Sequence, residues 1–277
     1  MGWDKKSFDG IYQQQDPRAY FATLGPLDYQ IPAHGCAVFR RLISALARDE
    51  APVTVLDLCC SYGLTAALVN HDLTLDDLYS RYTRPDLAEL SPDALMRADR
   101  DYFAARQQAR TARVIGVDAS VPALRYATGA GLLDAAFAEN LEEQPASPAL
   151  RAAVDRTDLV TVTGGIGYIS SRTFERLLGR RDDPPWVAAF TLRTVGYEPI
   201  AAVLDRYGLV TERLAGQPFK QRRFFDDRER RSTLDALARA GIDPTGLEAD
   251  GWYYAEFYLS RPPGHTSRHS LASLVAT

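Results

Sequence analysis

Four groups of polar and small residues each follow a predicted strand. They lie at residues 57–63, 118–120, 139–140 and 163–170. In an open parallel sheet a ligand binds outside the carboxyl ends of the strands, so these groups predict one shared binding site. Small residues at alternate positions of the first group, Cys59, Ser61 and Gly63, let backbone amides approach a bound nucleoside closely.

Alternating strand and helix patterns are expected to position these groups. Short apolar, β-branched runs predict strands at 53–58, 113–117, 133–137, 158–163, 186–192, 209–214 and 252–260. Helical patterns occupy 64–70, 146–154, 171–178 and 198–206, and Ser120 with Pro122 opens another helix. Runs that are apolar on both faces favour an α/β sheet covered by helices on both sides, with the last two strands antiparallel.

The remaining segments do not follow this alternation. We expect residues 51–260 to form the main domain, with helical insertions at 71–110 and 216–248 that cap the sheet. The second insertion contains an arginine-rich helix around 226–240. Residues 1–50 are interpreted as an N-terminal lid or helical segment, and residues 261–277, rich in Pro, Ser and His, as a loosely ordered tail.

The segment Val55-Leu-Asp-Leu-Cys-Cys-Ser-Tyr-Gly63 carries a more specific signal. It resembles the first-strand loop of the class I S-adenosylmethionine (SAM)-dependent methyltransferases, in which an acidic residue precedes three alternating glycines. Here only the third glycine is present, and Cys59 and Ser61 replace the others. The resemblance covers about residues 53–214. It implies a Rossmann-like, mostly parallel seven-stranded sheet with an antiparallel last strand.

The resemblance implies SAM as the cofactor. Asp57 would help to hold the methionine amino group, and Asp118 would accept both ribose hydroxyls, for which a carboxylate has enough lone pairs. Glu139 or Asn140 would face the adenine amino group, and the segment after the fourth strand would face the transferred methyl. The implied cofactor-binding residues are Asp57, Cys59, Ser61, Tyr62, Gly63, Asp118, Ala119, Glu139, Asn140, Thr163, Gly164 and Gly165.

An aromatic-rich segment precedes the sheet and includes Tyr12, Tyr20, Tyr29 and His34. In the family such a segment often folds over SAM, and aromatic faces attract a sulfonium cation. The methyl group is already activated by the positive sulfur, so the protein mainly excludes water and aligns the nucleophile. If the acceptor is a hydroxyl or a protonated amine, a base is needed, and the candidates are Tyr168, His34 and Tyr29.

Each of these residues also has a structural interpretation. Asp57 and Asp118 can serve as turn carboxylates or meet the charge of a helix N-terminus, and His34 can be a satisfied structural histidine. The cysteines fit packing better than nucleophilic catalysis, and the glycines after the fourth strand fit a tight turn. The arginines at 220–231 favour a solvated face, with binding of an acidic substrate as the alternative.

Composition limits the function classes. The net charge is −4 and the arginines are scattered among acids, which argues against nucleic acid as a partner. No apolar stretch approaches the length of a bilayer span, and the N-terminus lacks a secretion signal, so no membrane partner and a cytoplasmic location are expected. The four histidines predict no metal site. The expected partner is a small-molecule substrate, and the assembly a possible homodimer.

We interpret the chain as an enzyme, a SAM-dependent transferase that methylates a small molecule in biosynthesis. One alternative keeps SAM but transfers another alkyl group, or cyclises SAM and releases methylthioadenosine. Another is a non-catalytic binding subunit with the same fold. A nicotinamide-dependent dehydrogenase is disfavoured, because no G-x-G-x-x-G follows the first strand.

Replacement of Asp118 by alanine tests the implied ribose contact. The Asp118→Ala variant should bind SAM more weakly by about 1.5–3 kcal/mol, through the loss of charged hydrogen bonds. Isothermal titration calorimetry measures this difference, and an unchanged affinity would remove the assignment.

Overall fold

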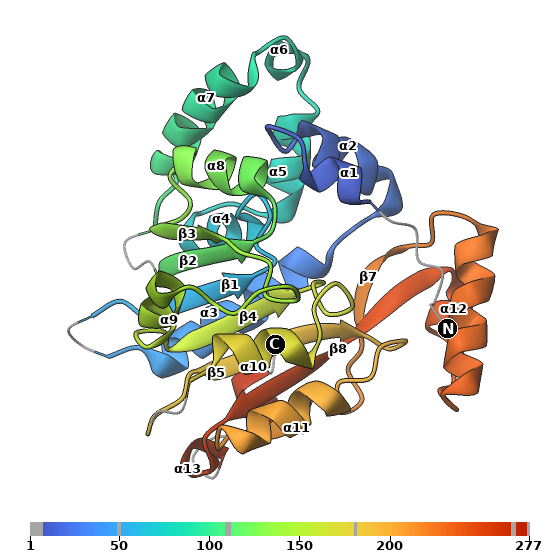
Figure 1. The fold of residues 1–277 in the computed structure, drawn as a ribbon. Coiled ribbons are helices and arrows are strands. Elements are labelled where there is room, and N and C mark those ends of the chain that lie inside the picture. Colours follow the sequence, from blue (N-terminus) through green and yellow to red (C-terminus); the bar gives the residue numbers. More distant parts are fainter. Residues whose placement is uncertain (1–7, 49–50, 109–111, 180–181, 267–269, 276–277) are drawn as a thin grey trace.

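The computed structural model describes residues 8–48, 51–108, 112–179, 182–266 and 270–275. A single mixed sheet crosses the molecule, with strand order β3-β2-β1-β4-β5-β8-β6 and with β7 paired to β8 (Figure 1). Strands β1 to β5 run parallel to one another, and β8 is antiparallel to its neighbours. Their bounds are Thr54–Leu58 (β1), Arg113–Asp118 (β2), Ala135–Ala138 (β3), Leu159–Thr163 (β4), Trp186–Leu192 (β5), Val210–Arg213 (β6), Phe219–Arg223 (β7) and Trp252–Arg261 (β8).

Helices cover both faces of the sheet because its central strands are buried on both sides. Every residue of β1 and β5 is buried, which accounts for their mainly apolar sequences. One core contains side chains of α3 (Ile31–Leu46), α4 (Leu64–Asn70), α8 (Val121–Gly129) and α14 (Leu271–Val275). The other contains side chains of α9 (Pro148–Val154), α10 (Ser171–Leu177) and α11 (Glu198–Arg206). The predicted α/β class and its antiparallel last pair are confirmed.

The sheet has one strand more than predicted. The segment 216–248 was expected to be a helical cap, but it begins with β7, which pairs with residues 252–255 at the start of β8. The other partner of β8 on this side, β6, pairs with its last four residues. Strand β7 therefore lies beyond the carboxyl end of β5, on the side of the predicted site. The arginine-rich helix is present as α12 (Asp227–Arg239).

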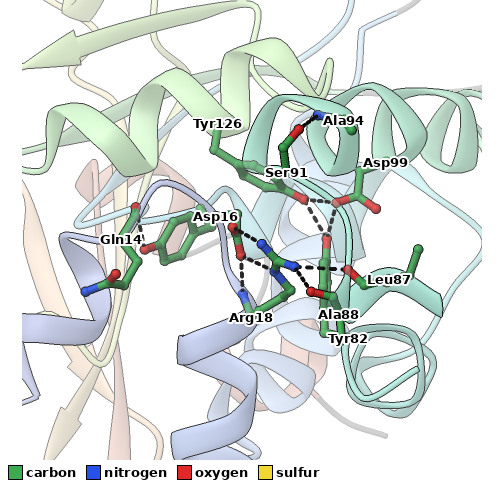
Figure 2. A network of polar contacts seen from close by, with 11 residues as sticks. Gln14, Asp16, Arg18, Tyr82, Leu87, Ala88, Ser91, Ala94, Asp99 and Tyr126 are labelled. Carbon is green, nitrogen blue, oxygen red and sulfur yellow. Dashed lines mark hydrogen bonds and ion pairs between the residues drawn. The ribbon is translucent and has the colours of Figure 1, made fainter. Parts of the chain in front are cut away.

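The first insertion contains helices, as predicted: α5 (Leu75–Tyr82), α6 (Pro85–Ala88) and α7 (Pro92–Ala104). Its centre is Asp99, which has no exposed surface. The Asp99 carboxylate accepts a hydrogen bond from Arg81 Nε at 2.6 Å. It also accepts hydrogen bonds from Tyr82 at 3.1 Å and from Tyr126 of α8 (Figure 2). One buried carboxylate thus joins α5, α7 and α8.

The N-terminal residues 8–24 form a strap that contains α1 (Asp9–Tyr12) and α2 (Arg18–Leu24). Arg18 is paired with Asp16 and donates to the carbonyl oxygens of Leu87 and Ala88 in α6, at 3.0 and 2.8 Å (Figure 2). These contacts join the strap to the first insertion, although about seventy residues separate the two in sequence.

The tail is more ordered than its composition suggested. Residues 263–266 form α13 (Pro263–Thr266), and α14 places Leu271, Leu274 and Val275 in the core beside α3. The expectation of a loosely ordered tail is therefore wrong for α14, while residues 267–269 and 276–277 lie outside the described residues. Among the described residues, no helix combines the length and the apolar character that crossing a membrane requires.

Replacement of Asp99 by alanine tests the link between the three helices. The variant leaves the Arg81 guanidinium and two tyrosine hydroxyls without their acceptor, and should lower the free energy of unfolding by about 3–5 kcal/mol. Asp101→Ala, at an exposed position of the same helix, should change it by less than about 0.5 kcal/mol. Urea denaturation of both variants measures the difference, and equal losses would contradict the role of Asp99.

Candidate active site

A cavity of about 290 Å³ opens at the carboxyl ends of β1 to β4. Its walls are the loops that follow these strands, together with Tyr12, Gln13 and Tyr20 of the strap. The structure brings twelve of the residues predicted for the site into this lining. They are Tyr29, Asp57, Cys59, Ser61, Asp118, Ala119, Glu139, Asn140, Thr163, Gly164, Gly165 and Tyr168.

Three predicted residues do not line the cavity. Tyr62 is buried beneath the strap, where its hydroxyl donates to the carbonyl oxygens of Ile11 and Gln14 at 2.7 and 3.0 Å. Gly63 is the residue before α4, and its backbone has a left-handed conformation (φ +79°) that glycine adopts freely. The ring of His34 packs edge-to-face against Phe219, with the two ring centroids 5.5 Å apart.

The loop after β1 has an unusual backbone. Cys59 and Ser61 both have positive φ values, 57° and 50°, and so share the left-handed conformation of Gly63. Residues with a side chain rarely adopt this conformation, whereas glycine does so freely. The alternate small residues Cys59, Ser61 and Gly63 that the sequence showed are therefore the residues with a left-handed backbone conformation. It turns the Cys59 amide to the carbonyl of Val117 at 2.8 Å and the Ser61 amide to Asp118.

Asp118 holds this loop against the end of β2. One carboxylate oxygen accepts from the Ser61 amide at 2.9 Å, and the other from the Ser120 amide at 2.8 Å. Burial raises the pKa of Asp118, and the backbone hydrogen bonds oppose that rise. Each oxygen has a further lone pair, so the carboxylate can still accept hydroxyl groups of a ligand.

Asp57 is the most buried acid of the cavity, with 2% of its surface exposed. It lies on β1 between Gly116 of β2 and Thr161 of β4, and it accepts a hydrogen bond from Thr161 at 2.7 Å. Burial raises the pKa of Asp57 to about 7, against hydrogen bonds from Thr161 and Thr65 that lower it. This carboxyl therefore gains or loses its charge near neutral pH.

The loop after β3 is fixed by its own acids. Glu139 accepts from the amide and the hydroxyl of Ser147, the residue that caps α9, at 2.9 and 2.6 Å. Asn140 is exposed and accepts from the Glu142 amide. Sequence reasoning did not select Glu142, which joins this loop to α10 through hydrogen bonds from Ser170 and Thr173. Because Glu142 lies 28 residues before Ser170, the N-cap of α10, this contact is recognisable only once the fold is known.

The strap closes the cavity on the side of Asp118. The Ser120 hydroxyl donates to the carbonyl of Tyr12 at 2.5 Å, and Tyr62 binds the strap on either side of that residue. The position of Tyr12 over the cavity is therefore set by Ser120, which was predicted to open a helix, and by Tyr62, which was predicted to contact the cofactor.

Two of the three residues proposed as bases, Tyr29 and His34, are poor bases at neutral pH. Burial raises the pKa of Tyr29 well above its ordinary value, so the hydroxyl keeps its proton and acts as a hydrogen-bond donor. Burial lowers the pKa of His34, whose Nε2 has no hydrogen-bond partner among the described residues. Tyr168 lines the cavity and is 46% exposed.

Glycines after β4 bring the main chain close to this site. A Cβ at Gly164 (φ +73°) would lie 3.0 Å from the Tyr29 hydroxyl, and a Cβ at Gly165 would lie 2.9 Å from Cys59. Two hydroxyl oxygens of the lining, Ser61 Oγ and Thr163 Oγ1, are buried without a partner among the described residues. The cavity thus combines close main-chain walls, three acids and unpaired hydroxyls, which fit a positively charged nucleoside.

No protein-family model matches the sequence, and no curated protein matches it. Solved structures do match. A TehB-like SAM-dependent methyltransferase from Corynebacterium glutamicum is 15% identical over 81% of this chain and 86% of that one, with a TM-score of 0.39. The plantazolicin methyltransferase BpumL, in complex with a triazolic desmethylPZN analog and SAH, is 12% identical over 91% and 95%, with a TM-score of 0.42. A precorrin-6y methyltransferase from Geobacter metallireducens is 8% identical over 80% and 87%, with a TM-score of 0.35.

The sheet itself decides the fold. Five parallel strands in the order β3-β2-β1-β4-β5 are followed by an antiparallel β8, as the sequence resemblance implied. The chain therefore has a Rossmann-like, mostly parallel α/β fold. The cavity lies where the strand order reverses between β1 and β4, the usual ligand position in an open α/β sheet.

The raised pKa of Asp57 predicts a pH-dependent affinity for SAM, which carries positive charge. Below about pH 7 the carboxyl is protonated and neutral, so affinity should rise as the pH increases through 7, by up to about tenfold per unit on the acid side. Because the pKa in the folded protein lies above its ordinary 3.8, the free energy of unfolding of the free protein should also fall as the pH rises from about 4 to 7.

Calorimetry of wild type and Asp57→Asn at about pH 6, 7 and 8 isolates this contribution, since titration of the SAM amino group itself is common to both. The difference in affinity should grow with pH. A constant difference would contradict an ionisation of Asp57 in this range.

Proposed function

We propose that this protein is a SAM-dependent methyltransferase with a small-molecule acceptor. The observation that carries the proposal is the meeting of Asp57 and Asp118, from the neighbouring parallel strands β1 and β2, in the lining of one cavity. Between them lies a loop whose alternate residues have left-handed backbone conformations. A carboxylate on each strand and a close main chain between them suit the two ends of an adenosyl sulfonium.

Different residues of the lining would bind different parts of the cofactor. Asp118 would accept the ribose hydroxyls with the lone pairs left by the Ser61 and Ser120 amides. Asp57 would oppose the positive charge of the methionine part, and binding of that charge favours its ionised form. Glu139 and Asn140, from the loop after β3, would face the adenine.

The chain's contribution to the reaction is then positioning and the exclusion of water. SAM, when bound, supplies a methyl carbon already activated by positively charged sulfur. The strap covers the cavity with Tyr12 and Tyr20, while Gly164 lets the main chain pass close to the Tyr29 hydroxyl. These groups hold the acceptor in line with the methyl carbon and keep water out.

Binding and product analysis test the proposal. Calorimetry should show one SAM or SAH bound per chain, because the cavity is a single site. After incubation with SAM and a panel of small amines, phenols and thiols, mass spectrometry should detect S-adenosylhomocysteine. Methylthioadenosine in its place would identify alkyl transfer or cyclisation. Absence of SAM uptake by the folded protein would favour a non-catalytic binding subunit and refute the proposal.

A further inference from the structure

Four tyrosines line one part of the cavity. They come from separate segments: Tyr12 and Tyr20 from the strap, Tyr29 from the turn before α3, and Tyr168 from the loop after β4. The ring centroids of Tyr12 and Tyr20 lie 5.8 Å apart, those of Tyr20 and Tyr29 6.2 Å apart, and both pairs are edge-to-face. The Tyr29 and Tyr168 hydroxyls lie close enough to Tyr12 to raise its pKa, and Tyr168 also raises the pKa of Tyr29. We call this group the tyrosine cage.

The charge of the cavity is negative. Among the described residues, its lining includes three acids, Asp57, Asp118 and Glu139, and no Lys, Arg or His. A buried anion would find no cationic partner there, and an unpaired buried charge is costly. Aromatic faces, by contrast, attract a cation.

The charge of Arg222 on β7 reaches the cage, where it acts on Tyr12 and Tyr29. Arg222 is 2% exposed and forms two hydrogen bonds with Glu229, at 2.7 and 2.9 Å. Its guanidinium also lies over the rings of Phe8 and Tyr253. Because this cation already has a full set of partners, it does not offer an anionic ligand a binding site.

The acids of the lining already accept hydrogen bonds from the protein. Asp57 binds Thr161, Asp118 binds two backbone amides, and Glu139 binds Ser147. Burial raises the pKa of Tyr12, Tyr20 and Tyr29, so these hydroxyls hold their protons at neutral pH. An acceptor that must first lose a proton to a base is therefore poorly served.

We propose that the acceptor is an amine whose nitrogen sits in the tyrosine cage and becomes an ammonium cation as it takes the methyl group. This rests on the function proposed above. The amine reacts as its free base, having released its proton to water before it enters the cavity. Its lone pair forms the new bond to the methyl carbon, and the electron pair of the broken carbon–sulfur bond returns to sulfur. Positive charge thus moves from sulfur to nitrogen, next to the aromatic faces. Where the nitrogen carries a hydrogen, its proton leaves afterwards to water.

A matched set of probes tests the cage. Wild-type protein is first saturated with SAH, which lacks the sulfonium charge. It is then titrated with choline, with 3,3-dimethylbutan-1-ol, the neutral analogue in which carbon replaces nitrogen, and with the 3,3-dimethylbutanoate anion. The three differ mainly in charge. Choline should bind at least about tenfold more tightly than the neutral analogue, and the anion should not bind.

Variants of the cage locate the effect. Tyr29→Leu should weaken choline binding by about tenfold, while Tyr29→Phe, which keeps an aromatic face, should retain most of it. Tyr168→Leu changes a half-exposed side chain and serves where Tyr29→Leu disturbs folding. Tyr207→Leu, at the end of α11 on the other face of the sheet, should have no effect.

The outcomes separate the two proposals. If SAH does not bind, the proposed methyltransferase function fails. If SAH binds but choline does not, or the neutral or anionic analogue binds as well as choline, the amine acceptor is refuted and the cofactor site stands. The amine acceptor is refuted in the same way if the cage variants bind choline as tightly as wild type.

Discussion

The carboxylate of Asp118 joins the loops that follow β1 and β2, and the shape of the cavity depends on this junction. Through the Ser61 amide it fixes the loop after β1, and through the Ser120 amide it fixes the start of α8. Ser120 in turn holds the carbonyl of Tyr12, so the position of the strap also follows from it. A single acid at a strand end thus organises three segments that are far apart in sequence.

The backbone of the loop after β1 is costly for its sequence. A non-glycine residue in the left-handed region is strained by about 1–3 kcal/mol, and two occur here, at Cys59 and Ser61. The hydrogen bonds to Val117 and Asp118 hold the strained conformation in place. In return, the floor of the cavity carries a thiol and a hydroxyl where glycines would leave bare main chain.

The central fold was predictable because the signals that specify it are local. The helices at 64–70 and 198–206 and the strand at 186–192 were located to the residue, since apolar periodicity and caps are written in adjacent residues. Strand β7 was missed because its sequence, Phe-Lys-Gln-Arg-Arg, is charged, and because Arg222 owes its burial to other elements, namely Glu229 of α12 and Tyr253 of β8. Tyr62 and His34 were misplaced for the same reason, as each is positioned by contacts with a segment far away in sequence. Asp57 and Asp118, by contrast, could be predicted as soon as the strands that carry them were assigned.

The link between Arg18 and the carbonyls of α6 has a consequence for how molecules enter and leave. The strap can swing aside only if the guanidinium releases α6 or if α6 travels with it. Exchange at the cavity is thereby mechanically coupled to a helix that does not touch the cavity. A change in the packing around α6 would alter how long a bound molecule stays, without altering any group that holds it.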